Sequence, residues 1–149
     1  MNVGLIKKLL KDIESGRLNV YDGLELLKVL PFEELEFATL DSHRALRQGF
    51  PEVIFGEGKT TAQIKAIARK MLARKENVLI TRLGSVKGRA LRKAFPKALY
   101  DETSRTVLIK SHKIRETGIG TVLIISAGTS DVPVAEEAAV TAECMGNRV

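Results

Sequence analysis

The residues whose types and spacing best suit chemistry lie in a polar turn, residues 126–131, which follows a β-branched apolar run. Gly128 lets a ligand approach the backbone closely, while Thr129, Ser130 and Asp131 supply two hydroxyls and a carboxylate. A helix is expected directly after the turn, and the free N–H groups of its first turn favour an anion. A phosphate or a ribose hydroxyl is the natural ligand; the alternative is that Ser130 or Asp131 only caps the helix.

A second group of candidates lies upstream, in a charged block that contains three glycines. Its cations, Arg44, Arg47 and Lys59, are expected to bind the anionic part of a substrate, because arginine can hold an oxyanion in bidentate fashion. Glu52 and Glu57 could orient these cations or bind Mg²⁺ near a phosphoanhydride. The glycines favour a ligand-facing loop, and the alternative is a surface ion-pair network that contributes little stability.

Other reactive side chains are few. The single cysteine, Cys144, is expected in the last turn of a helix, whose negative partial charge raises a thiol pKa, so it is not expected to be catalytic. One cysteine also excludes a disulfide framework within the chain. The two histidines, His43 and His112, have no partner at ligand spacing, so no metal site is expected.

The composition is that of a soluble globular protein. The chain has 149 residues, of which 44% are hydrophobic and 28% charged, enough for one ordinary domain or a small domain plus part of another. No apolar run approaches the roughly 18 residues of a membrane span. Lysines interrupt the amphipathic first 14 residues, which are therefore not expected to be a signal peptide. A cytoplasmic protein without membrane contact is the expectation.

The net charge of +6 is unevenly distributed. Residues 1–120 hold 23 of the 24 lysines and arginines and 14 of the 18 acidic residues, so they carry +9, and residues 121–149 carry −3. This asymmetry predicts a domain boundary near residue 120. Basic residues recur within 65–75 and 87–97, off the apolar face of two expected helices, and are predicted to be a solvated surface. No stacking aromatic accompanies them, so nucleic acid is not an expected partner.

Periodicity predicts the elements of residues 1–120. Apolar residues at helical spacing predict helices over 3–15 and 20–30, which would form a hairpin. A strand is predicted over 35–40. The following alternation of strands and helices predicts a small α/β domain with a largely parallel sheet. Its expected strands are 53–55, 77–81, 98–100 and 106–109, and its helices are 60–75, capped by Thr60 or Thr61, and 85–95, capped by Ser85.

Residues 121–149 are predicted to begin a different domain. The run 121–125 is typical of a buried parallel strand, and Pro133 fits the first turn of a helix over 134–145 that stops at Gly146. A single strand and helix cannot bury both of their faces. The predicted fold class is therefore α/β: a helical hairpin and small α/β domain, then the start of a doubly wound parallel sheet.

The sequence of the turn resembles a known family. Residues 122–139 read Val-Leu-Ile-Ile-Ser-Ala-Gly-Thr-Ser-Asp-Val-Pro-Val-Ala-Glu-Glu-Ala-Ala. This looks like the opening of the PurE family, which interconverts carboxylated aminoimidazole ribonucleotides (AIR) and begins with a strand, a Gly-Ser-x-Ser-Asp turn and a helix. Ser130, Asp131 and Pro133 match the motif. Ala127 and Gly128 replace the family's Gly and first Ser, a phosphate ligand, which bears on the choice of nucleotide.

The upstream block resembles a narrower branch. Residues 41–44 read Asp-Ser-His-Arg, and residues 47–60 read Arg-Gln-Gly-Phe-Pro-Glu-Val-Ile-Phe-Gly-Glu-Gly-Lys-Thr. This pattern is similar to that of pyridinium-3,5-biscarboxylic acid mononucleotide synthases, the LarB branch, which serve nickel-pincer cofactor synthesis. The resemblance extends over nearly the whole chain, and members of the branch continue for roughly another hundred residues, about one more domain.

The resemblance implies a reaction. The branch carboxylates the pyridinium ring of nicotinic acid adenine dinucleotide and cleaves its phosphoanhydride, with carbon dioxide or bicarbonate as co-substrate. A cysteine thiolate first adds to the electron-poor ring, and that cysteine is expected downstream of Val149, so the chain alone is expected to be inactive. No cofactor is expected within this chain, Mg²⁺ is possible for the full-length enzyme, and a homo-oligomer is expected at full length.

Two other functions stay open from the sequence. One is an AIR carboxylase- or mutase-like activity in purine biosynthesis, which the first motif alone would also suit. The other is a non-catalytic basic interaction domain or RNA-binding module, which the positive net charge would suit.

Overall fold

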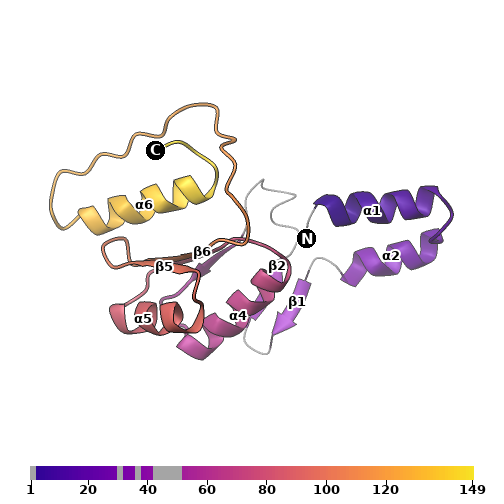
Figure 1. The fold of residues 1–149 in the computed structure, drawn as a ribbon, viewed down its shortest axis with the longest axis horizontal. Coiled ribbons are helices and arrows are strands. Elements are labelled where there is room, and N and C mark those ends of the chain that lie inside the picture. Colours follow the sequence, from indigo (N-terminus) through magenta and orange to yellow (C-terminus); the bar gives the residue numbers. More distant parts are fainter. Residues whose placement is uncertain (1–2, 30–31, 36–37, 42–51) are drawn as a thin grey trace. The chain divides into compact units, whose positions relative to one another are not determined.

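The computed structural model describes residues 3–29, 32–35, 38–41 and 52–149. They group into two compact units, Met1–Glu52 and Val53–Val149 (Figure 1). The predicted α/β fold class is confirmed, since helices and strands alternate through the second unit.

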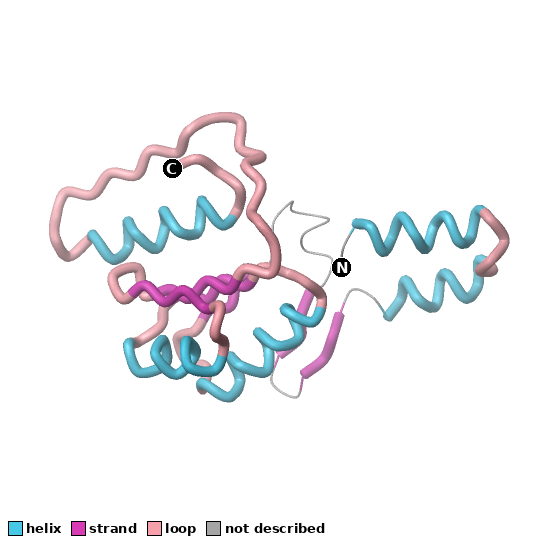
Figure 2. The backbone as a smooth tube through the Cα atoms, viewed as in Figure 1, coloured by secondary structure: helices cyan, strands magenta, loops and turns pink. Residues whose placement is uncertain are grey.

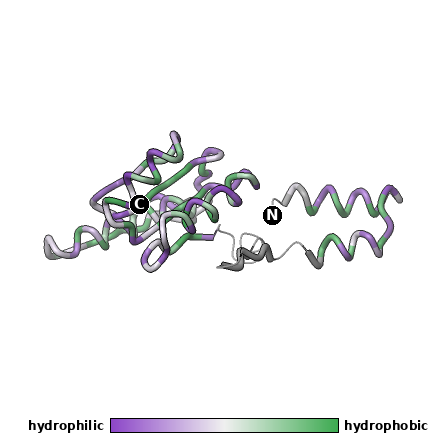
Figure 3. Tube along the Cα trace, turned by 90° about the horizontal axis from the view of Figure 1, so that it is seen from below, coloured by the Kyte–Doolittle hydropathy of each residue, from purple (hydrophilic) through white to green (hydrophobic). Residues whose placement is uncertain are grey.

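The first unit begins with the predicted helical hairpin. Helix α1 (Val3–Glu14) and helix α2 (Val20–Val29) pack against each other, and Gly16 reverses the chain after α1 with a φ of +72°. Both helices alternate between hydrophobic and hydrophilic residues along the tube in Figure 3, as an amphipathic pair should. Asn19 caps α2, because its side-chain oxygen accepts the backbone N–H of Asp22 at 2.8 Å.

Two short strands follow where one was predicted. Strands β1 (Phe32–Leu35) and β2 (Ala38–Asp41) pair antiparallel, with Phe32 opposite Asp41 and Leu35 opposite Ala38. The prediction of a single strand over 35–40 was therefore wrong. Two adjacent glutamates occupy the middle of β1, and glutamate is disfavoured in strands. The residue types of this segment therefore did not indicate a strand.

The second unit is built on a four-stranded sheet in the order β3-β4-β6-β5. All four strands were predicted at these positions, and they are β3 (Val53–Phe55), β4 (Val78–Thr81), β5 (Ala98–Asp101) and β6 (Thr106–Ile109). The prediction of a largely parallel sheet was wrong, because only β3 and β4 run parallel. Four residues join β5 to β6, which is long enough for a hairpin and too short for the crossover that parallel strands need.

Helices cover both faces of this sheet. Helices α4 (Thr61–Ala73) and α5 (Ser85–Ala94) lie side by side on one face, and α6 (Val132–Cys144) lies on the other (Figure 1). The first layer is closely packed: Ile64 on α4 and Leu91 on α5 have no exposed surface. The core between helices and sheet is aliphatic, in keeping with a chain that has no Trp.

The helix starts differ in how they are capped. Thr60 caps α4 as predicted: its hydroxyl accepts the Gln63 N–H at 3.2 Å, and the Gln63 side chain accepts the Thr60 N–H at 2.8 Å. The prediction for α5 was wrong. Gly84 is its N-cap, and Ser85 is the first helical residue, where its hydroxyl accepts a hydrogen bond from Arg89.

The predicted strand over 121–125 is not formed. Residues 110–131 run as loop between β6 and α6 (Figure 2), and the one pairing there is a parallel bridge between Thr121 and Arg148. The Val122 N–H donates to the Arg148 carbonyl at 2.8 Å. Leu123 and Ile125 are 79% and 82% exposed. A strand needs a hydrogen-bonded neighbour along its length, and in this structure Thr121 alone of the run is paired.

Candidate functional site

The polar turn before α6 brings three of its predicted site residues together. The Ser130 hydroxyl lies 3.4 Å from a carboxylate oxygen of Asp131. A Cβ placed on Gly128 would lie 3.5 Å from oxygen atoms of both side chains, so the two polar groups gather over the bare glycine. Thr129, between Gly128 and Ser130 in the sequence, is exposed. The turn thus presents hydroxyl and carboxylate oxygens beside a stretch of backbone without a side chain.

The side chains of this turn do not cap the helix. Helix α6 begins at Val132 with Pro133 in its first turn, as predicted, and Asp131 is the N-cap residue. Asp131 makes no side-chain capping hydrogen bond, and its backbone is helical rather than extended. The turn is instead closed by its backbone, since the Asp131 N–H donates to the Gly128 carbonyl at 3.0 Å. The interpretation that Asp131 only caps the helix is therefore wrong for this structure.

A polar contact fixes α6 to the sheet. One Glu137 carboxylate oxygen accepts the backbone N–H of Arg82 at 3.2 Å, and the other lies 3.1 Å from the Arg82 Nε. Arg82 directly follows β4 and has a φ of 55°, an uncommon conformation for a residue with a side chain. The Glu137 side chain is 16% exposed, and that of Arg82 is 39% exposed. This contact holds the helix that carries the polar turn.

The Arg82–Glu137 contact was not predicted from the sequence, and no role in the site was expected for either residue. The two residues are 55 positions apart, and local patterns carry no information on such a pairing. The one available signal was the position of Arg82, a cation at the carboxyl end of a buried strand, where binding residues of α/β sheets gather.

The charged block contributes one described loop, between β3 and α4. Glu57 is exposed and Lys59 is half-buried, and Gly58 between them has a φ of +76°, a conformation that favours glycine. Gly56 is buried: a Cβ there would come within 2.7 Å of the Leu83 side chain. The Lys87 ammonium donates to the Gly56 carbonyl at 3.2 Å, a tie that the sequence did not predict. The loop is therefore shaped by its glycines.

The remaining members of the block are described only in part. Glu52 is half-buried. Arg44 and Arg47 lie outside the described residues, and so does His43. The assembly of an anion site from the three predicted cations therefore stays a prediction.

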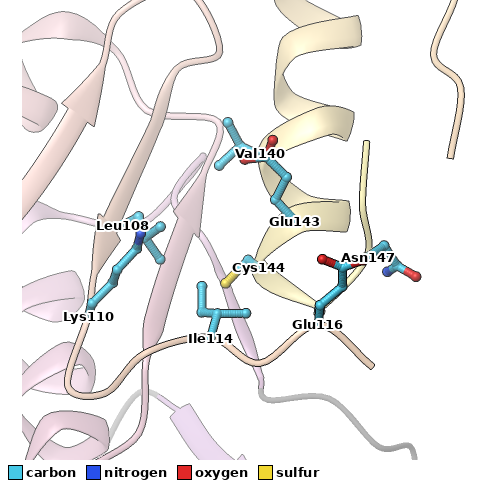
Figure 4. Close-up of a pocket in the computed structure, with 9 residues that line it drawn as sticks. Leu108, Lys110, Ile114, Glu116, Val140, Glu143, Cys144 and Asn147 are labelled. Atoms are coloured by element: carbon cyan, nitrogen blue, oxygen red, sulfur yellow. The ribbon is translucent and has the colours of Figure 1, made fainter. Parts of the chain in front are cut away.

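Cys144 lines a pocket at the far end of α6. The pocket has a volume of about 250 Å³, and the Cys144 sulfur, Lys110 and Ile114 lie around it (Figure 4). The thiol is buried, and burial raises its pKa, while the Lys110 ammonium acts in the opposite direction. The raised pKa agrees with the expected direction, but its main cause is burial and not the expected charge of the helix end. A thiol held protonated is a poor nucleophile, and α6 separates it from the polar turn by about 20 Å at 1.5 Å per residue.

Two further properties concern the described residues only. No group of three or more His, Cys, Asp and Glu side chains in this part of the chain is arranged to hold a metal ion. No helix within it is long and apolar enough to cross a bilayer.

Comparison with known proteins identifies the family of the chain. Residues 32–112, more than half of the chain, match the LarB/PurE-like N-terminal domain. The chain belongs to this family. Its charged block and the whole four-stranded sheet fall within the matched residues, and the polar turn and α6 lie beyond them.

A longer relative extends past the family domain. The chain is 33% identical over 147 residues to the uncharacterized protein MJ0165 of Methanocaldococcus jannaschii. The match covers 95% of this chain and 57% of that protein, so the chain spans a little over half the length of its relative. Because the match covers 95% of the chain, it includes most of residues 121–149 as well as the LarB/PurE-like domain.

Proposed function

We propose that this LarB/PurE-related protein binds a nucleotide or dinucleotide, with the turn at residues 126–131 holding its ribose and phosphate. The observation that carries the proposal is that the Ser130 and Asp131 side chains gather over Gly128 and that no side chain caps the Val132 N–H at the start of α6. The Val132 N–H, together with the Thr129 and Ser130 hydroxyls, can donate to phosphate oxygens. The Asp131 carboxylate can accept hydrogen bonds from a ribose diol, as acidic residues do in other nucleotide-binding folds.

The proposed reaction is that of the LarB branch: carboxylation of the pyridinium ring of nicotinic acid adenine dinucleotide with cleavage of its phosphoanhydride. The residues of this chain would bind and orient the dinucleotide. Lys59, with Arg44 and Arg47, would bind anionic groups of the substrate, and Glu57 and Glu52 would orient those cations. Cys144 is not the proposed nucleophile, because it is buried and its pKa is raised.

We also propose that residues 121–149 open a further domain. The parallel bridge between Thr121 and Arg148 encloses α6, which is the connectivity of a strand–helix–strand unit. Exposed Leu123 and Ile125 would be buried once the run 121–125 is paired along its length. The greater length of the archaeal relative is consistent with this continuation.

The proposal is tested by calorimetric titration of the chain with nicotinic acid adenine dinucleotide. Ser130→Ala should weaken binding about tenfold, because a lost hydrogen bond to a charged group contributes about 1.5 kcal/mol. Asp131→Asn keeps the shape of the turn and should weaken binding by a similar factor. The matched control is Thr103→Ala, which removes an exposed hydroxyl in the loop between β5 and β6, outside the turn, and should leave the affinity unchanged. Equal affinities for all four proteins would contradict the proposal.

A further inference from the structure

Helices α4 and α5 concentrate positive charge on one side of the sheet. Residues 58–100 contain twelve lysines and arginines and a single acidic residue, Glu76. The two helices contact each other on the same face of the sheet, so the basic residues of both lie on one side of it (Figure 1). We define this α4–α5 basic face by its exposed and half-exposed members, Lys65, Arg69, Arg89, Arg92, Lys93 and Lys97.

The described part of the chain leaves most of this charge uncompensated. Within it, only Arg89 of the basic face has an ion pair, with Glu102 at 3.8 Å, and both of those side chains are about two-thirds exposed. Helix α6, on the opposite face of the sheet, carries three glutamates and no lysine or arginine. The acidic residues of the second unit therefore lie partly on the wrong side of the sheet to neutralise the basic face.

The side chains among these cations restrict the kind of partner. Neither α4 nor α5 contains an aromatic residue, and Val86 is the one large hydrophobic side chain exposed on them. Protein hot spots and membrane-surface helices both rely on apolar anchors, which this face lacks. Single-stranded nucleic acids are bound by stacking on aromatic rings. A duplex requires only cations directed at its phosphates.

We propose that the α4–α5 basic face binds the phosphate backbone of double-stranded nucleic acid. Helix α4 alone is about 20 Å long, the length of about six base pairs. In the sequence, the lack of aromatic residues argues against nucleic acid as a partner. On this face it argues against single strands only, because a duplex is bound through its phosphates without stacking on aromatic rings. The proposed nucleotide turn precedes α6, which lies on the other face of the sheet, so the two binding functions are separable.

Fluorescence anisotropy with labelled duplexes tests this proposal. The complete 149-residue chain is titrated into a DNA duplex, an RNA duplex and a single strand of equal length. We expect binding to at least one duplex that is tighter than binding to the single strand. With about four phosphates contacted, the affinity should fall about 150-fold between about 50 and 200 mM salt. The two duplex arms show whether DNA or RNA is the source of the backbone.

A charge-matched pair of variants locates the surface. Arg69→Glu with Lys93→Glu reverses one exposed cation on each helix, and Lys113→Glu with Arg115→Glu reverses two exposed cations in the loop after β6. Both double variants lower the net charge from +6 to +2. The first should lose more than about tenfold in affinity and about two units of salt slope, and the second should lose little.

Three results would overturn the proposal. The first is no duplex binding by the wild-type chain at about 50 mM salt. The second is equal loss in both double variants, which would assign binding to net charge alone. The third is tighter binding to a polyglutamate peptide or to anionic vesicles than to duplex, which would assign the face to an acidic protein or a membrane surface. If the two glutamates disturb folding, as circular dichroism would show, the double variant Arg69→Gln with Lys93→Gln repeats the test.

Discussion

The two helical layers of the second unit cover the same sheet in different ways. Helices α4 and α5 bury fully enclosed side chains such as Ile64 and Leu91 and present a basic surface to solvent. Helix α6 buries Cys144, is fixed by the polar contact of Glu137 with Arg82, and follows the exposed apolar run 121–125. The first layer is thus held by closed packing. The second rests on the polar contact of Glu137 with Arg82 and on a partial core.

The largest effect expected from this difference is on global stability. Leu91→Ala removes a fully buried side chain from the α5 layer and should lower the free energy of unfolding by about 3 kcal/mol. Val140→Ala, at a half-buried site on α6, should cost about 1 kcal/mol or less. Urea denaturation of both variants measures the contrast. Similar losses at the two sites would remove the distinction between the layers.

An intermediate effect is expected when the polar contact is removed. Glu137→Gln deprives Arg82 of a charged acceptor, so α6 should open locally more often. We expect its amides to exchange about tenfold faster, a lower value than for a fully buried charged pair because Arg82 is partly exposed. Hydrogen exchange followed by mass spectrometry measures this rate. Glu136→Gln on the exposed side of α6 is the control, and faster exchange in α4 and α5 as well would show that the layers open together.

The smallest effect concerns pH. Burial raises the pKa of the Cys144 thiol, so the folded chain holds this proton more tightly than the unfolded chain. The contribution of this proton to the free energy of unfolding is fully present below the ordinary thiol pKa of about 8.5. It is lost as the pH rises toward the higher pKa that the thiol has in the folded chain. Denaturation between pH 7 and about pH 10 should therefore show a steeper decline for the wild type than for Cys144→Ala. Parallel curves would mean that the thiol is equally solvated in both states.

The parts of the fold that depend on local chemistry were predictable. Apolar spacing placed the hairpin helices, and Thr60 or Thr61 was expected to cap α4, which Thr60 does. Pro133 and Gly146 likewise marked the ends of α6, because their backbone preferences act within a few residues. The four strands of the second unit were found from their apolar runs, which alternate with turn residues.

What depended on distant partners was not predictable. The short connection between β5 and β6 already required these two strands to run antiparallel, and the prediction of a largely parallel sheet overlooked it. The pairing of β6 with β4, by contrast, required the fold. The run 121–125 has strand-like side chains, yet strand formation needs a neighbour that the chain supplies at one residue only. For the candidate site, the polar turn could be named from its residue types. The contact of Arg82 with Glu137 that positions α6 required the fold.

The central claim is that a nucleotide binds at the turn before α6 and not on the α4–α5 basic face. Amide chemical-shift mapping of the isotope-labelled chain with nicotinic acid adenine dinucleotide tests it most directly. The account predicts concentration-dependent shifts at residues 127–134, with α4 and α5 unmoved except at high ligand concentration. Shifts confined to α4 and α5, or no shifts at residues 127–134 at saturating ligand, would contradict it.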